Sequence, residues 1–212
     1  MSGFLVLVGG GGHGRVVLDT ALSMGLEILG IVDAGFARGD RIFGVPVLDG
    51  DDVLHRNGAD SMGWLNGIGA NPDIARRRAV FDDWGGDTAV GVVHPGAAIG
   101  RECRIASSAQ IMAGVTVQSR TSIGDNAVIN TGAQIDHDCC IGAHSFIAPG
   151  AILCGDVALE EGVFVGAGAT LLPGVRIGRG TIIAAASVVT SAVPPAVLMR
   201  GSPARPIRSI EQ

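Results

Sequence analysis

His137 and Asp138 are the first candidates for chemistry, because a basic and an acidic side chain stand side by side there. Histidine is the side chain whose ordinary pKa lies nearest neutrality, so it can take a proton from a substrate at physiological pH. A neighbouring carboxylate can orient the imidazole and raise its basicity. We therefore interpret His137 as a candidate general base and Asp138 as its partner.

A glycine run near the N-terminus is the second candidate site. Gly9, Gly11 and Gly14 fit the pattern G-x-G-x-x-G, and Asp33 follows about twenty residues further on. Alone, this pattern favours a dinucleotide held at a helix N-terminus, as in an NAD-dependent oxidoreductase. Only about 90 residues precede the repeats of the second half, which leaves room for one mononucleotide-binding half. We therefore expect the nucleotide of a substrate here.

The second half of the chain repeats with a period of six residues, which fits neither a helix nor an ordinary strand. Aliphatic residues recur at Ile99, Ile105, Ile111, Val117, Ile123, Ile129, Ile135, Ile141, Ile147, Leu153, Leu159, Val165, Leu171, Ile177, Ile183 and Val189. A small or β-branched residue stands two positions before each of them. This pattern predicts a solenoid with both sets of side chains inside, and leaves its hand open. Glycines after five aliphatic positions predict tight turns, at Gly100, Gly124, Gly142, Gly166 and Gly178.

Three strands per coil would make residues eighteen apart direct neighbours. Gly155 then lies one coil after His137, leaves room beside the imidazole and offers a backbone N–H to an oxygen that gains negative charge. Asp138 lies between Arg120 and Asp156, so we expect Arg120 to keep the carboxylate ionised.

A metal site is a competing interpretation of the same segment, because His137, Cys139, Cys140 and His144 all carry metal-ligand atoms. Cys139 falls on an inward position of the repeat, so its thiol should point away from His137. The four cysteines also form no Cys-x-x-Cys pair. We expect reduced thiols and no metal, and a solvated turn position for His144.

The first part of the chain alternates predicted strands and helices. Strands are expected at residues 4–8, 27–32 and 61–68, and helices at 13–24 and 73–84. Asn71 is the expected cap of the second helix, with Pro72 at its first position. This order predicts a small parallel sheet.

The composition excludes several classes of protein. Hydrophobic residues make up 47% and charged residues 17%, as in a globular protein. A formal net charge of -5 disfavours nucleic-acid binding. The first residues, MSGFLVLVGG, show neither the basic segment nor the cleavage pattern typical of a signal peptide, and no apolar run reaches ~18 residues, so we expect a cytoplasmic protein without a membrane partner.

Six short motifs, in this order and spacing, connect the chain to a known family. They are VGGGGHG at residues 8–14, IGAN at 68–71, HPGA at 94–97, NTG at 130–132, DHDC at 136–139 and GSPAR at 201–205. With the repeats, they resemble the sugar acetyltransferases related to the PglD and NeuD enzymes, which are hexapeptide-repeat acyltransferases. The resemblance covers nearly the whole chain.

This resemblance implies an α/β N-terminal Rossmann-like domain plus an all-β left-handed parallel β-helix. Residues 1–92 would bind a nucleotide sugar, residues 93–198 would form the acetyltransferase β-helix, and residues 199–212 would contribute to CoA binding. The implied reaction is acetyl-CoA-dependent N-acetylation of the 4-amino group of a nucleotide-linked 4-amino-4,6-dideoxy sugar, in polysaccharide biosynthesis. The implied assembly is a homotrimer with active sites between subunits.

The resemblance also implies site residues. His137 would be the base, assisted by Asp138. The substrate-binding residues would be Gly11, Gly12 and His13 at the diphosphate or sugar, Asp33 and Ala34 by the base, and Gly69 and Asn71 closing the pocket. The CoA-binding residues would be Phe146, Gly155, Ala167, Ala185 and Arg205.

Two positions depart from the family pattern. Relatives often have an acidic residue in place of Ala34, so UDP, GDP and dTDP stay open as the nucleotide. Many have histidine in place of Phe146, which could instead line the pantetheine channel or pack between subunits. Sialic acid O-acetylation and a non-catalytic hexapeptide-repeat binding protein remain alternatives, whereas an oxidoreductase would leave the repeats without a role.

Overall fold

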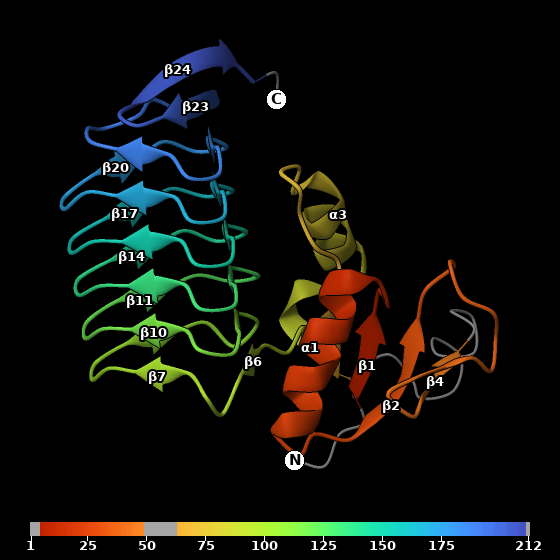
Figure 1. Cartoon of the computed structure of the whole chain (residues 1–212). Coiled ribbons are helices and arrows are strands. Elements are labelled where there is room, and N and C mark those ends of the chain that lie inside the picture. Colours follow the sequence, from red (N-terminus) through yellow and green to blue (C-terminus); the bar gives the residue numbers. More distant parts are fainter. Residues whose placement is uncertain (1–4, 49–62, 211–212) are drawn as a thin grey trace.

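The computed structural model describes residues 5–48 and 63–210, and these form an α/β region followed by a parallel β-helix (Figure 1). The predicted fold class is confirmed at this level. The helices of the α/β region lie beside the β-helix, and the C-terminal strands close its far end (Figure 1).

The α/β region is built on a five-stranded sheet with the order β3-β4-β2-β1-β5. Strands β1, β2, β4 and β5 are parallel, and β3 is an antiparallel edge strand. The bounds are β1 Leu5–Val8, β2 Ile28–Val32, β3 Arg41–Ile42, β4 Val45–Leu48 and β5 Gly63–Asn66. The helices are α1 Gly12–Ser23, α3 Ala75–Asp83 and the short 3-10 helix η1 Gly86–Thr88.

The predicted elements of this region are present, with shorter bounds. Residues 4, 61 and 62 of the predicted strands lie outside the described residues. The β3–β4 hairpin was not expected. The predicted cap of the second helix is wrong, because α3 begins three residues after Pro72. The N-cap residue is Ile74, which makes no side-chain cap hydrogen bond, and the first helical N–H, that of Ala75, donates to Asp73 Oδ1 at 2.7 Å.

The β-helix consists of two-residue parallel strands in three sheets, and the third sheet ends in two longer strands, β23 and β24, which pair antiparallel. The first sheet contains β7 Ala98–Ile99, β10 Thr116–Val117, β13 Gln134–Ile135, β16 Ile152–Leu153, β19 Thr170–Leu171 and β22 Val188–Val189. The second contains β8 Arg104–Ile105, β11 Ser122–Ile123, β14 Cys140–Ile141, β17 Ala158–Leu159 and β20 Arg176–Ile177. The third contains β6 Val92–Val93, β9 Gln110–Ile111, β12 Val128–Ile129, β15 Phe146–Ile147, β18 Phe164–Val165, β21 Ile182–Ile183, β23 Val197–Gly201 and β24 Ala204–Ser209.

The register of these sheets agrees with the predicted stacking. Ile135 pairs with Val117 on one side and Leu153 on the other, eighteen residues away each time. The aliphatic positions from Ile111 onward and most of the small positions form one buried core. The predicted boundaries at residues 92/93 and 198/199 stay predictions; β6 and β23 of the third sheet contain them.

Inward polar side chains in this core satisfy backbone carbonyls. The Thr121 hydroxyl donates to Asp136 O at 2.9 Å, and the Ser145 hydroxyl donates to Glu160 O at 3.2 Å. The Cys139 thiol occupies the equivalent place and donates to Cys154 O at 3.3 Å. Each inward hydroxyl or thiol thus donates to a backbone carbonyl fifteen residues later, so these buried donors are paired and the turn at that carbonyl is held in place.

The glycines that follow five of the aliphatic positions were predicted to serve tight turns, and this prediction is wrong. Their φ angles are not among the positive ones; the positive-φ turn residues are others, such as Gly132 and Gly150. A Cβ on Gly124 would instead lie 2.7 Å from the Ala143 nitrogen of the next coil. These glycines allow adjacent coils to approach closely.

The outer face of the third sheet is the surface on which the α/β region packs. Val128, Phe146 and Phe164 form a cluster there with Ala70 and Ile74. The rings of Phe146 and Phe164 stack with centroids 5.7 Å apart. This apolar contact fixes the loop before α3 against the β-helix.

Candidate functional site

His137 and Asp138 lie in the turn that connects β13 of the first sheet to β14 of the second. His137 Nδ1 is 2.8 Å from Asp138 Oδ2, and the His137 N–H donates to Asp136 Oδ1 at 2.8 Å. Because Nδ1–H donates to the carboxylate, the neutral ring leaves Nε2 unprotonated. The side chain is more than half exposed, so Nε2 can meet a substrate. The predicted pair is therefore in contact, with the geometry of a base and its orienting carboxylate.

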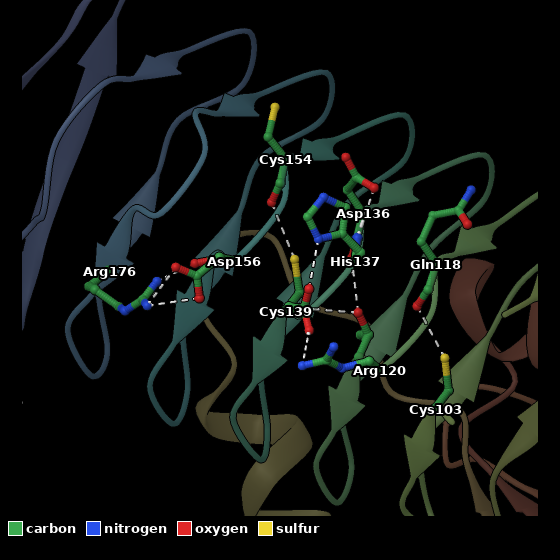
Figure 2. Close-up of polar contacts among 11 residues, drawn as sticks. Cys103, Gln118, Arg120, Asp136, His137, Cys139, Cys154, Asp156 and Arg176 are labelled. Atoms are coloured by element: carbon green, nitrogen blue, oxygen red, sulfur yellow. Dashed lines mark hydrogen bonds and ion pairs between the residues drawn. The ribbon is translucent and has the colours of Figure 1, made fainter. Parts of the chain in front are cut away.

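Arg120 holds the other oxygen of the same carboxylate. Its Nη2 lies 3.0 Å from Asp138 Oδ1, as predicted from the stacking of coils. Arg120 and Asp138 both have positive φ angles, 64° and 59°, which repeats one turn shape in consecutive coils. Asp156, in the next coil, pairs instead with Arg176 (Figure 2).

The electrostatics of this turn favour a stronger base than free histidine. The hydrogen bond to Asp138 is the largest influence, and it raises the pKa of His137; the charge of Asp136 raises it further. Arg120 acts weakly in the opposite direction. The imidazole is thus poised to accept a proton close to physiological pH.

Gly155 provides the space beside the imidazole that the sequence predicts. A Cβ on this residue would lie 2.6 Å from His137 Cε1 and 2.7 Å from Nε2. Its backbone N–H has no hydrogen-bond acceptor within residues 5–48 and 63–210. The glycine therefore presents a free donor next to the free ring nitrogen.

A cavity of about 640 Å³ lies between the α/β region and the β-helix, and we call it the interdomain cavity. One side is formed by the start of α1 and by residues 69–72. The other side is formed by the outer face of the third sheet and by the turns that lead from it to the first sheet. Of the predicted site residues, it is lined by Gly12, His13, Gly69, Asn71, Phe146, Ala167 and Ala185. The cavity thus joins predicted nucleotide-sugar residues to predicted CoA residues.

The remaining predicted residues lie outside this lining. Gly11 is the exposed N-cap of α1. Asp33 accepts hydrogen bonds from the Gly10 N–H at 2.6 Å and the Gly35 N–H at 2.8 Å, so its carboxylate holds the glycine run in place. Ala34 follows it in a turn. Arg205 lies in the C-terminal hairpin, where its guanidinium donates to Ala204 O.

His137 and Asp138 are also absent from the lining of the interdomain cavity. Their turn joins the first sheet to the second, whereas the cavity turns join the third sheet to the first. The width of the first sheet separates the two edges. One chain therefore carries the two parts of the candidate site on different edges of its β-helix.

Sequence reasoning missed the polar residues behind the cavity. Gln110 is fully buried on the outer face of the third sheet, and its Oε1 lies 3.1 Å from His13 Nε2. Arg77 is buried and donates to Asn66 O, Ile68 O and Asn126 O. Burial lowers the pKa of Arg77 to about 9, which leaves it charged at neutral pH. The sequence did offer one signal for Gln110: it is a polar residue at a repeat position where the other two-residue strands of the third sheet carry apolar residues.

His144 is not the solvated turn residue that the sequence indicated. It is half-buried, and its Nδ1 lies 3.0 Å from Asn126 Nδ2. The Phe81 and His144 rings pack edge to face, with their centroids 5.4 Å apart. Burial lowers the pKa of His144, so it is a neutral part of the domain contact. The Cys139 side chain is buried in the core of the β-helix, where its thiol donates to Cys154 O (Figure 2). The described part of the chain contains no group of three His, Cys, Asp or Glu side chains that could hold a metal.

Comparisons with known proteins agree with the motifs. The model of the PglD N-terminal domain matches residues 4–83, and that of the bacterial transferase hexapeptide repeats matches 120–155 and 156–191. A search of curated proteins finds no match. In residues 5–48 and 63–210, no helix has the length and apolar character needed to cross a membrane.

Solved structures are similar over nearly the whole chain. A variant of perosamine N-acetyltransferase from Caulobacter crescentus, in complex with CoA and GDP-perosamine, is 35% identical, with a TM-score of 0.87 and 98% of both chains covered. The acetyltransferase domain of PglB from Neisseria gonorrhoeae, in complex with acetyl coenzyme A, is 27% identical, with a TM-score of 0.87, over 96% of this chain and 98% of that one. WeeI from Acinetobacter baumannii, at 24% identity, a TM-score of 0.84 and coverage of 96% and 99%, shares the fold.

Proposed function

Since this chain belongs to the family of hexapeptide-repeat sugar acetyltransferases with a PglD-type N-terminal domain, we propose that it acetylates a nucleotide-linked 4-amino-4,6-dideoxy sugar at its 4-amino group, with acetyl-CoA as donor. The observation that carries this proposal is the free Nε2 of His137, which is backed by Asp138 and lies beside Gly155. The relative with 35% identity, whose structure holds CoA and GDP-perosamine, supports the substrate class.

In the proposed reaction, His137 Nε2 takes a proton from the sugar amine as its nitrogen attacks the thioester carbonyl. The C–N bond forms, the C–S bond breaks, and the imidazolium returns the proton to the leaving thiolate. Asp138 stabilises the transient imidazolium through Nδ1–H. The Gly155 N–H stabilises the oxyanion of the tetrahedral intermediate.

Acetyl-CoA would lie along the edge where the third sheet meets the first. Ala167 and Ala185 are exposed there, and their backbone N–H groups have no acceptor among the described residues. Small side chains let a thin pantetheine arm approach these donors, and Phe146 offers an apolar wall. Arg205 would contribute a positive charge to the phosphates from the C-terminal hairpin.

The nucleotide would bind at the N-terminus of α1. Gly11 and Gly12 have open space where a side chain would stand, so their backbone can approach a diphosphate. Asp33 and Ala34 would lie by the base, with Gly69 and Asn71 closing the pocket on the other side.

A homotrimer would unite the two separated edges. The outward positions of the first sheet carry no charge: Ala98, Thr116, Gln134, Ile152, Thr170 and Val188. This sheet lies between the His137 edge and the cavity edge, and Ile152 is 42% exposed on it. We place the subunit contact at this face, so that His137 of one subunit meets the interdomain cavity of the next.

An acetyl-transfer assay tests the proposal. Purified protein and acetyl-CoA are offered UDP-, GDP- and dTDP-linked 4-amino-4,6-dideoxy sugars, and release of free thiol is followed. We expect release with one of them, abolished in His137→Ala and retained in the control His94→Asn. No release with any sugar would favour the alternatives, sialic acid O-acetylation or a non-catalytic binding protein.

A further inference from the structure

His13 is positioned by both halves of the molecule. It lies in the first turn of α1 and lines the interdomain cavity. The centroid of its ring is 5.6 Å from the centroid of the Phe146 ring. Its Nε2 lies 3.1 Å from Gln110 Oε1, in β9 of the β-helix. The α/β region therefore presents this imidazole to the cavity, and the β-helix holds it from behind.

The hydrogen bonds of Gln110 determine which ring nitrogen carries the proton. Gln110 Nε2 donates to Asn66 O at 2.8 Å, and a backbone carbonyl can only accept. The Gln110 amide is thus fixed with Oε1 toward His13. Since Oε1 is also only an acceptor, His13 Nε2 must be the donor.

The ring is neutral, which makes the other nitrogen an acceptor. Burial and the nearby Arg77 guanidinium lower the pKa of His13 to about 4. With Nε2 protonated and the ring uncharged, Nδ1 holds a lone pair. Within residues 5–48 and 63–210, Gln110 is the one hydrogen-bond partner of the His13 ring, so Nδ1 is unpaired.

We propose that His13 is a specificity-determining residue whose Nδ1 accepts a hydrogen bond from an N–H or O–H group of the ligand in the interdomain cavity. A diphosphate is ionised at neutral pH and has no hydrogen to donate, so His13 reads another part of the ligand. Two sources can supply the donor: an amide of the CoA pantetheine, or the amine or a hydroxyl of the sugar. Naming these ligands rests on the proposed function; the protonation of the ring does not.

Nuclear magnetic resonance of protein with isotope-labelled histidine nitrogens tests the first step. The His13 signals, assigned by their loss in His13→Gln, are expected to show a protonated Nε2 and an unprotonated Nδ1 from about pH 6 to 8. A protonated Nδ1 would overturn the proposal. This measurement needs neither ligand nor turnover, so it stands even where the proposed reaction fails.

Two matched variants test the second step. The Asn side chain places its amide near the position of Nδ1, so His13→Asn can keep an acceptor there. Gln reaches toward the position of Nε2, so His13→Gln keeps the bond to Gln110 but leaves nothing at Nδ1. Circular dichroism and thermal melting show that both variants fold before they are compared.

Isothermal titration with CoA, with the nucleotide amino sugars and with the bare nucleoside diphosphates then identifies the donor. We expect about tenfold weaker binding of one ligand by His13→Gln and a smaller loss by His13→Asn. A loss for CoA identifies a pantetheine amide, and a loss for the sugar nucleotide alone identifies the sugar. Equal affinities in wild type and His13→Gln, or a loss that appears equally with the bare diphosphate, would overturn the proposal. If no sugar nucleotide binds, the CoA titration decides alone.

Discussion

Gly155 and His137 are direct neighbours in adjacent coils: a Cβ on residue 155 would lie 2.6 Å from Cε1 of the imidazole. The register of the β-helix creates this contact, since the two residues are eighteen positions apart. The glycine is needed for space, because its φ is not among the positive ones. Its role can therefore be tested without straining the backbone.

Gly155→Ala is expected to lower turnover and leave the fold intact. The added methyl group pushes the exposed imidazole aside, and a displacement of about 1 Å at a reacting group can cost about a hundredfold in rate. Steady-state kinetics and thermal melting measure the two effects. Ser119→Ala, in the same column one coil before His137, is the control and should keep its activity. Full activity in Gly155→Ala would show that the imidazole does not act from this position.

The pH dependence should shift in opposite directions in two variants. His137 must be neutral to act as a base, so activity falls as pH drops below its pKa, which lies above the ordinary value. Asp138→Asn removes the main cause of the raised pKa and should move the acid limb to lower pH. Arg120→Gln removes a charge that lowers the pKa and should move it to higher pH.

Profiles of kcat/KM between about pH 5 and 9 measure these limbs. Arg76→Gln, an exposed arginine on α3, serves as the control for loss of a positive charge. Shifts of both variants in the same direction would contradict the assignment of the limb to His137.

Ala185→Leu should raise KM for acetyl-CoA by about tenfold, with a smaller change in kcat, because an added side chain overfills the cavity edge. Ala113→Leu is the matched control, since it lies in the same column four coils earlier and outside the cavity lining. Titration of CoA and steady-state kinetics compare the two. An unchanged KM in Ala185→Leu would place CoA elsewhere.

Ile152→Glu should break the proposed trimer, since an unpaired charge on the uncharged face of the first sheet is costly to bury. Light scattering after size-exclusion chromatography measures the mass. Ala158→Glu, on the outer face of the second sheet, should stay associated. A persistent trimer in Ile152→Glu would place the contact on another face.

Mixing two inactive or impaired variants gives an independent check of the shared site. If His137 of one subunit serves the cavity of the next, co-assembly of His137→Ala with Ala185→Leu creates some sites with both parts intact. At an acetyl-CoA concentration below the raised KM of Ala185→Leu, the activity of the mixture should then exceed the sum of the activities of the two variants measured separately. Activity no greater than the sum of the separate variants would mean that each subunit acts alone.

The α/β region shows where sequence patterns were incomplete. Its parallel strands follow from short apolar runs and the glycine turn, yet α3 begins at Ala75, whose N–H donates to Asp73 Oδ1. Asn71, the predicted cap, instead lines the interdomain cavity. Both residues are good caps, and only the path of the loop against the β-helix distinguishes them.

The repeat by itself determined the β-helix, its buried positions and the neighbours of His137. A period of six is a local property, and three strands per coil bring Arg120, Asp138 and Gly155 into their places by counting. Contacts that depend on how the two halves dock have no such period. The orientation of the Gln110 amide, the protonated nitrogen of His13 and the burial of Arg77 were therefore decided by the tertiary structure, because hydrogen-bond partners 97 residues apart meet only when the domains pack together.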